Sequence, residues 1–234
     1  MRVALFSDIH GHITGLKAVL AHVDRLGGAD ITYALGDFVG GGPGVEDVLD
    51  LLLARQVRMI RGNWDEIFID LNAHLTRIPP GNHQFVRQTL AWLTSRLSPD
   101  HQALLANLPL SETLELSPTN RLFLCHAAPQ DAWARVCQAN TPIDDLRKAY
   151  GPLDAQVIAY GHYHQQHILQ LDHQLLINVA SVGLGWQGLS SLTLLEDLHD
   201  KISIQQYQVP YDFHEHTRLI RERGMPDDPA IWYW

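Results

Sequence analysis

Residues 2–12 read RVALFSDIHGH, an apolar run followed at once by Asp8 and His10. A short run of this kind predicts a buried β-strand. Side chains two positions apart on an extended segment share one face, so Asp8 and His10 are expected to point the same way. A carboxylate and an imidazole together at the end of a strand indicate a metal site.

The same arrangement recurs along the chain. Asp37 follows ITYAL, Asn63 follows the shorter VRMI, and His126 follows RLFL, while the pair His162 and His164 follows QVIAY. The carboxyl ends of neighbouring strands meet in one crevice, where open α/β sheets bind their ligands. Seven side chains therefore predict a single two-metal centre: Asp8, His10, Asp37, Asn63, His126, His162 and His164.

The donor set indicates which metals fit. It contains only nitrogen and oxygen ligands, which favours Mn, Fe, Co, Ni or Zn over a Cys-rich structural zinc site. Two divalent ions ~3.5–4 Å apart clamp the attacking and leaving oxygens of a phosphoryl displacement and lower the pKa of a bound water. Asp37 is the expected bridge, because its carboxylate has two oxygens and it lies in a Gly-Asp turn after a strand.

Composition limits the class of protein. The 234 residues suit one domain, with 46% hydrophobic and 18% charged residues. A formal net charge of −9 argues against nonspecific nucleic-acid binding but leaves a small phosphorylated substrate open. We expect no membrane partner, because no run reaches ~18 apolar residues. Nor does the start of the chain resemble a signal peptide.

The cysteines point to a reducing compartment. Cys125 and Cys137 form no CxxC pair, and Cys125 is expected to be a buried thiol facing away from His126 on its strand. A cytoplasmic location is therefore the expectation.

The first third of the chain alternates strand and helix. Strands are expected at 2–7, 31–35 and 57–61, and helices at 13–26 and 44–55. Helical connections of this length predict right-handed crossovers and a parallel sheet.

The next segment, about 66–108, is predicted to be a helical insertion that caps the site within a single domain of residues 1–234. Within it a helix is expected to stop at Pro79-Pro80-Gly81 and another to start at Ser98-Pro99.

Strands dominate from 112 onward, and their hairpin-like connections predict a second, partly antiparallel sheet. The expected strands are 112–116, 121–125, 156–160, 166–171, 174–179, 190–195 and 202–208, before a helix near 212–223. The aromatic end, Ile231-Trp232-Tyr233-Trp234, is expected to dock on the domain. Self-association into a homo-oligomer through it is the alternative.

The motifs Asp8-Ile9-His10, Gly36-Asp37, Gly62-Asn63-Trp64-Asp65, His126 and Gly161-His162-Tyr163-His164 together resemble the calcineurin-like metallophosphoesterase superfamily, most of all its small bacterial phosphodiesterase branch. The resemblance runs from residue 1 to about 185 and includes Asn178–Gly183, NVASVG. It implies a four-layer αββα sandwich, an α/β (α+β) fold with a dinuclear site.

The resemblance also implies roles. One metal would be held by Asp8, His10 and His164, and the other by Asn63, His126 and His162, with Asp37 as the bridge. A hydroxide between the ions would attack phosphorus in line. The residues implied to serve catalysis are His12, Asn63, Asp65 and His126.

Two of these roles have alternatives. Asp65 is expected to orient a metal-binding histidine, or else to be an acid favoured by the dipole of a helix N-terminus. His12 is expected to contact substrate, or else to be a solvated loop residue.

The chain departs from the family pattern at two points. Trp64 stands where many relatives have a histidine thought to assist the leaving group. The GDFVGGG turn lacks the arginine with which protein phosphatases hold phosphate, and Arg61, on a strand, is expected to point away.

We therefore predict a hydrolase of phosphoester bonds, most of all a phosphodiesterase acting on a small or nucleotide-like substrate. The alternatives are a phosphomonoesterase or protein phosphatase, or a non-catalytic scaffold on the same fold.

Overall fold

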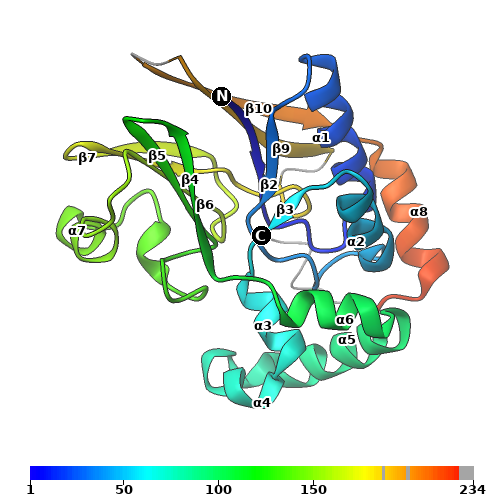
Figure 1. Ribbon diagram of the computed structural model, residues 1–234. Coiled ribbons are helices and arrows are strands. Elements are labelled where there is room, and N and C mark those ends of the chain that lie inside the picture. Colours follow the sequence, from blue (N-terminus) through cyan, green and yellow to red (C-terminus); the bar gives the residue numbers. More distant parts are fainter. Residues whose placement is uncertain (186–187, 199–200, 227–234) are drawn as a thin grey trace.

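The first sheet, sheet A, joins the beginning of the chain to its last strands (Figure 1). Its order is β10-β9-β1-β2-β3. The strands are β1 (Arg2–Phe6), β2 (Ile31–Ala34), β3 (Arg58–Met59), β9 (Leu189–Asp197) and β10 (Ile202–Pro210). β1, β2 and β3 are parallel, as predicted, and β9 is antiparallel to both β1 and β10.

The computed structural model describes residues 1–185, 188–198 and 201–226. The predicted docking of Ile231–Trp234 therefore lies outside the described residues.

Sheet B is mixed, with the order β4-β5-β6-β8-β7. It consists of β4 (Ser111–Ser117), β5 (Asn120–Cys125), β6 (Val157–Tyr160), β7 (His167–Leu171) and β8 (Gln174–Asn178). The hairpins β4–β5 and β7–β8 are antiparallel, whereas β6 runs parallel to both β5 and β8. The predicted second, partly antiparallel sheet is therefore confirmed.

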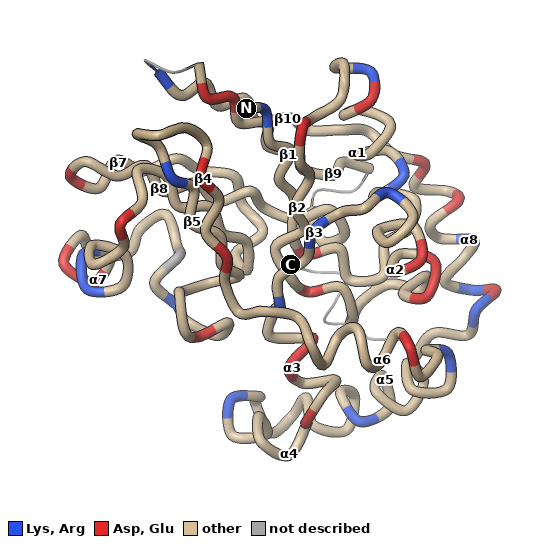
Figure 2. The backbone as a smooth tube through the Cα atoms, in the orientation of Figure 1, with Lys and Arg blue, Asp and Glu red and all other residues tan. Residues whose placement is uncertain are grey.

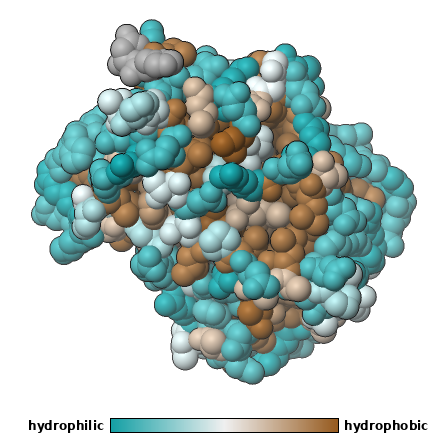
Figure 3. All heavy atoms as spheres, viewed as in Figure 1, coloured by the Kyte–Doolittle hydropathy of each residue, from teal (hydrophilic) through white to brown (hydrophobic). Residues whose placement is uncertain are grey.

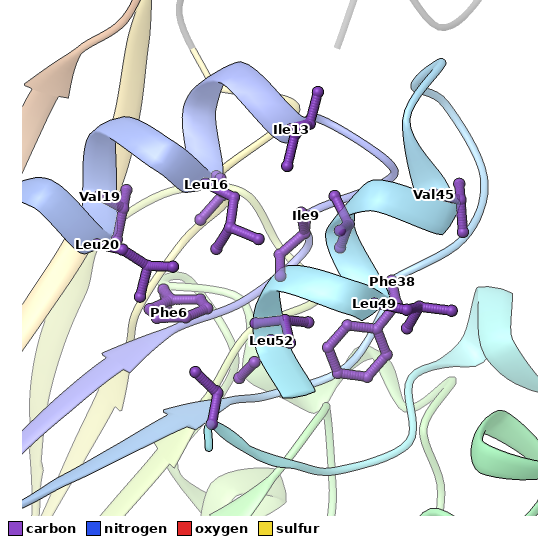
Figure 4. Close-up of a cluster of buried hydrophobic side chains, with 14 of the residues drawn as sticks. Phe6, Ile9, Ile13, Leu16, Val19, Leu20, Phe38, Val45, Leu49 and Leu52 are labelled. Carbon is purple, nitrogen blue, oxygen red and sulfur yellow. The ribbon is translucent and has the colours of Figure 1, made fainter. Parts of the chain in front are cut away.

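Two helices cover the outer face of sheet A. They are α1 (Ile13–Arg25) and α2 (Val45–Ala54). Apolar residues three and four positions apart make one buried stripe on each, Leu16, Val19, Leu20 and Val23 on α1 and Val45, Val48, Leu49 and Leu52 on α2. These stripes pack on Phe6, Ile9 and Phe38 in the core between helices and sheet (Figure 4).

The alternation of side chains along β1 builds two cores at once. Ala4 and Phe6 face the helices, while Val3 and Leu5 belong to a second core between the two sheets. The outer face of sheet B packs on a further helix, α7 (Ile143–Tyr150), through residues such as Tyr160. Helix, sheet, sheet and helix give the predicted four-layer αββα sandwich.

The segment between β3 and β4 is helical, as expected (Figure 1). It contains α3 (Asn63–Ile69), α4 (Leu71–His74), α5 (His83–Arg96) and α6 (Pro99–Ala106), with single 3₁₀ turns at Leu75–Arg77 and Pro80–Asn82. Pro79 precedes the second 3₁₀ turn, and the Ser98 side chain caps α6 by accepting the His101 N–H. The predicted helix stop and helix start within this segment are therefore confirmed.

Two features differ from the expected order. β9 and β10 do not extend the second sheet but complete sheet A beside β1. Helix α7 was not predicted, although Pro142, first-turn acids and last-turn bases are typical signals of a helix. The final helix, α8 (Phe213–Arg223), lies where a helix was expected and packs on α1.

The described surface is mixed in character. Lys and Arg are scattered among Asp and Glu in the view of Figure 2. Hydrophobic atoms gather near the middle of the face in Figure 3. Half-exposed apolar side chains include Leu53 on α2, Ile143 on α7 and Ile168 on β7, so they do not form one strip along a single element. None of the described helices combines the length and apolar character that a membrane span requires.

Candidate metal centre

The predicted ligands lie in tight turns at the strand ends. Asp8, His10, Asp37 and His162 all adopt positive φ angles, of 52°, 49°, 56° and 67°. Left-handed backbone costs a non-glycine residue roughly 1 kcal/mol or more, and such residues concentrate at functional sites. The turns are also packed closely, because a side chain at Gly161 would collide with Asp8.

One group of donor atoms comes from β1 and from the turn after β6. Ligand atoms of Asp8, His10 and His164 lie within 4.8 Å of one another. Nε2 of His164 is 3.2 Å from Oδ1 of Asp8, and Nε2 of His10 is 3.8 Å from the same oxygen. These are the three residues that the sequence assigns to one metal.

A second group brings Asp37 together with His126 and Asp8, again within 4.8 Å. Oδ2 of Asp37 lies 3.6 Å from Nε2 of His10 and 3.5 Å from Nε2 of His126, so one carboxylate oxygen faces a donor of each group. Its other oxygen, Oδ1, accepts the backbone N–H of Trp64 at 2.8 Å, which fixes the orientation of the carboxylate. This geometry suits a bridging ligand.

The tautomers of two histidines suit metal binding. Nδ1 of His10 is 3.1 Å from the carbonyl oxygen of Val39, and Nδ1 of His126 is 2.6 Å from that of Leu35. A carbonyl oxygen only accepts, so in each neutral ring Nδ1 carries the proton and Nε2 offers its lone pair. Nε2 of His10 is buried and has no hydrogen-bond partner, so its lone pair is available to a metal ion.

Electrostatics in this centre also favour a cation. Burial, followed by the charges of Asp8 and Asp65, raises the pKa of Asp37 well above its ordinary value. Burial lowers the pKa of His10 to about 3, with a further contribution from His164. Among the described residues no Lys or Arg forms an ion pair with Asp8 or Asp37, so a divalent ion would supply the missing positive charge.

Two further predicted ligands stand beside these groups. Oδ1 of Asn63, the first residue of α3, is 3.0 Å from Nε2 of His126. The ring of His162 lies 5.2 Å from that of His126, and its backbone N–H donates to Oδ2 of Asp8 at 2.9 Å. Burial lowers the pKa of His162 to about 3, so this imidazole is neutral. All seven predicted residues thus meet at one edge of the two sheets.

Comparison with known proteins agrees with this geometry. The model of the calcineurin-like phosphoesterase superfamily domain matches residues 1–201. The chain belongs to this superfamily. Its members are hydrolases of phosphoester bonds that use divalent metals, and this chain carries the corresponding candidate ligand clusters.

Curated relatives of the chain extend the comparison. A symmetrical bis(5'-nucleosyl)-tetraphosphatase of Escherichia coli O139:H28 is 31% identical over 136 residues, which cover 57% of this chain and 45% of that protein. The chain therefore matches less than half the length of that relative.

Two solved structures share the fold over nearly the whole chain. A metallophosphoesterase from Sphaerobacter thermophilus has a TM-score of 0.72 at 20% identity, over 99% of this chain and 96% of the other. A hypothetical protein from Pyrococcus horikoshii OT3 has a TM-score of 0.82 at 16% identity, with the same two coverages.

Asp65 has different partners from those expected from the sequence. Its carboxylate accepts the backbone N–H groups of Asp37 and Phe38 at 3.0 Å, Val39 at 3.4 Å and Gly62 at 2.8 Å. The predicted contact with a metal-binding histidine is thus replaced by four backbone contacts that join the Asp37 turn to the start of α3. Burial raises the pKa of Asp65 to about 7, against the opposing effect of these donors.

His12 caps a helix. Its Nδ1 accepts the N–H of Gly15 at 3.0 Å at the start of α1, and the residue is 2% exposed. The ring stacks on His216 and makes an edge contact with Tyr211. The alternative of a solvated loop histidine is therefore wrong, and contact with substrate stays a prediction.

Trp64 borders the centre. Its ring is perpendicular to that of His10, with 6.3 Å between centroids, and it lies against the turn at Gly40. Arg61 points elsewhere, as expected, because its guanidinium donates to the carbonyl of Ala106 on α6. Cys125 is the predicted buried free thiol, and burial raises its pKa.

Sequence reasoning missed three residues around the centre. His216 had no usable spacing, yet it contacts His12 across more than 200 positions. Asn178 and Ser181 were noted only as part of a family motif, although both hydrogen-bond to turns that carry ligands. A buried asparagine at the end of a strand is the one local signal for this role.

Proposed function

We propose that the chain is a metal-dependent phosphodiesterase that acts on a small or nucleotide-like phosphoester. The observation that carries the proposal is the convergence of Asp8, His10, Asp37, His126 and His164 on two overlapping donor groups. Two divalent transition-metal ions, chosen from Mn, Fe, Zn, Ni or Co, suit these nitrogen and oxygen donors. Such ions supply Lewis acidity toward a phosphoryl oxygen and a lowered pKa for a bound water.

The protein's own residues would prepare the centre for this chemistry. Val39 and Leu35 hold His10 and His126 in the tautomer that presents Nε2. The N–H of Trp64 turns Asp37 so that Oδ2 faces both histidines. Because these contacts are set before substrate arrives, little reorganisation would be needed during the reaction.

Access to the centre would be shaped by the helical insertion, which we propose to be a cap within a single domain. Trp133, in the loop after β5, donates from Nε1 to Oε2 of Glu66 on α3 at 2.8 Å. His74 stacks on the same indole, and the guanidinium of Arg77 lies over it at 5.7 Å. The insertion and the His126 loop therefore form one wall near the metal ligands.

The preference for a diester is supported by what surrounds the centre. The indole of Trp64 is not an acid that could protonate a leaving alkoxide. Arg61 is bonded to Ala106, away from the ligands. Both observations disfavour the alternative of a phosphomonoesterase or protein phosphatase. A non-catalytic scaffold is disfavoured because all seven ligand positions keep donor side chains.

We propose further that the substrate is a free small molecule. The acidic net charge, together with the scattering of Lys and Arg among Asp and Glu along the backbone in Figure 2, argues against nonspecific nucleic-acid binding. The free thiol of Cys125 supports a reducing, cytoplasmic location.

The test is hydrolysis by metal-stripped protein supplied in turn with Mn²⁺, Zn²⁺, Ni²⁺ or Fe²⁺. Bis-(p-nitrophenyl) phosphate should be hydrolysed faster than p-nitrophenyl phosphate. Because one relative is named as a bis(5'-nucleosyl)-tetraphosphatase, nucleosyl tetraphosphates are the first nucleotide substrates to try. Faster hydrolysis of the monoester would move the protein to the phosphomonoesterases. No hydrolysis despite two bound ions would favour the scaffold.

A further inference from the structure

The segment Asn178–Gly183, here called the crossing segment, connects the two sheets beside the metal centre. It begins at the end of β8 in sheet B, and the chain next enters sheet A at Leu189, the start of β9. Asn178 and Ser181 are both fully buried. Ligands come from both sheets, so this connection passes between the two halves of the centre.

On the side of sheet A the crossing segment holds the Asp8 turn. The Ser181 hydroxyl donates to the carbonyl oxygen of Asp8 at 2.7 Å, and the N–H of Gly183 donates to the same oxygen at 3.0 Å. The N–H of Val182 donates to the carbonyl of Ser7 at 2.9 Å. Three bonds therefore support a turn in which Asp8 has a positive φ of 52°.

On the side of sheet B it holds the turn before His162. The Asn178 side chain donates from Nδ2 to the carbonyl of Gly161 at 2.8 Å. Its Oδ1 accepts the N–H of Ala180 at 2.8 Å, which stabilises the positive φ of 60° at Ala180. The amide thus ties the crossing segment to the residue that precedes His162.

The two turns are joined directly as well. The backbone N–H of His162 donates to Oδ2 of Asp8 at 2.9 Å. A small shift of either turn would therefore change the separation between Asp8 and the histidines of sheet B.

On the basis of the metal centre proposed above, we infer that Ser181 and Asn178 are positioning residues that set the distance between the metal ligands of the two sheets. Neither side chain is a ligand in this assignment. Ser181 acts through the Asp8 turn, and Asn178 acts through the His162 turn. Residues that orient ligands in this way typically contribute 10–100-fold to metal affinity.

The structure provides a matched control for Ser181. Ser190 is also fully buried, and its hydroxyl also donates to a backbone carbonyl at 2.7 Å. Its acceptor is the carbonyl of Val182, which lies within the crossing segment but in neither the Asp8 turn nor the His162 turn. Ser181→Ala removes the bond to the Asp8 carbonyl and the bond from the Leu184 N–H, whereas Ser190→Ala removes no bond to Ser7 or Asp8.

The experiment compares metal titrations of the two metal-stripped variants with the wild type, using Mn²⁺ and Zn²⁺, and their unfolding in a chelator. Both variants should lose stability without metal, and Ser181→Ala should lose more because it removes two bonds. Ser181→Ala should weaken metal binding by about 10-fold or more, while Ser190→Ala should remain within about twofold of wild type. Equal affinities in the two variants would overturn the inference.

A second pair tests the other turn and serves if Ser181→Ala does not fold. Asn178→Ala should lose one of two bound ions at a concentration that saturates the wild type. Gln174→Ala should keep both, because the buried Gln174 amide on the same strand donates to the carbonyls of Tyr150, Leu153 and Ala155. Loss of an ion in both variants, or in neither, would count against positioning by Asn178.

Failure of the proposed function would look different. In that case the wild-type protein itself would bind no pair of ions or would hydrolyse no phosphoester. Failure of the positioning inference leaves the wild type active and makes the matched variants alike.

Discussion

The imidazole ring of His216 on α8 stacks on that of His12 at the start of α1, with centroids 3.5 Å apart and 11° between their planes. Nδ1 of His216 and Nε2 of His12 are buried without hydrogen-bond partners. Two stacked imidazoles cannot both be protonated at low cost, so protonation should weaken this contact between the two helices.

Stability should therefore fall in mild acid. Burial lowers the pKa of His216 to about 4 from an ordinary value of 6.5. Between these values the unfolded chain binds more protons than the folded one, so the free energy of unfolding is fully retained above pH 6.5 and decreases as pH falls toward 4. His216→Asn should reduce this slope in urea titrations of metal-stripped protein. His214→Asn, an exposed position on the same helix, is the control, and equal slopes in both variants would refute the assignment.

Asp37→Asn should separate activity from stability. Turnover should fall by ~100-fold or more, since a bridging ligand matters at least as much as the residues that orient ligands. Without metal the variant should be as stable as the wild type or more so at pH 8, because the neutral amide removes repulsion from Asp8 and Asp65. Chelator-treated unfolding and steady-state kinetics measure the two effects. Near-normal turnover would exclude the bridging role.

Asp65→Asn should behave in the opposite way. The carboxylate accepts four backbone N–H groups, and an amide cannot accept them all because its own nitrogen is a donor. The free energy of unfolding should fall by about 1–3 kcal/mol even without metal. Unfolding in chelator alongside Asp37→Asn provides the comparison, and a fully stable Asp65→Asn protein would contradict this structural role.

Trp64→His should restore a proton donor beside the centre. Hydrolysis of esters with poor leaving groups should increase by ~10-fold or more, and that of p-nitrophenyl esters much less, because only the former need protonation. Trp64→Phe is the control, since it changes the ring without adding an acid. An equal effect on both classes of ester would remove the proton-delivery explanation.

Trp133→Phe should weaken the wall between the insertion and the His126 loop. The variant loses the 2.8 Å bond to Glu66, so unfolding should become easier by about 1 kcal/mol and KM should rise with little change in kcat. Trp92→Phe is the matched control. The Nε1 of Trp92 on α5 donates to the carbonyl of Arg223 on α8, so this variant also loses one indole hydrogen bond between two elements. Similar KM values in the two variants would show that the wall does not contact substrate.

The sequence contains enough local information to predict most of the fold. Strand and helix boundaries in the first third were within about two residues, because apolar periodicity and the Gly-Asp turns are local signals. The helix stop and helix start within the insertion followed from Pro79-Pro80-Gly81 and Ser98-Pro99 for the same reason. The convergence of the ligands followed from their shared position at strand ends.

The remaining features depend on pairing between distant segments. Nothing in the sequence of β9 states that it pairs with β1 rather than with β8, because its nine residues suit either sheet. The partners of Asp65 are backbone groups, which have no sequence signature. The contact of His216 with His12 depends on where α8 docks, and this is decided by packing.

The position of β1 has a consequence for synthesis on the ribosome. β1 lies between β2, which is made early, and β9, which begins more than 180 residues after β1 ends. A nascent chain that ends at residue 65 already contains Asp8, His10, Asp37 and Asn63, but it lacks both β9 and the crossing segment. The edge of β1 that pairs with β9 therefore stays open until β9 has emerged from the ribosome. Contact with chaperones would matter most during this interval.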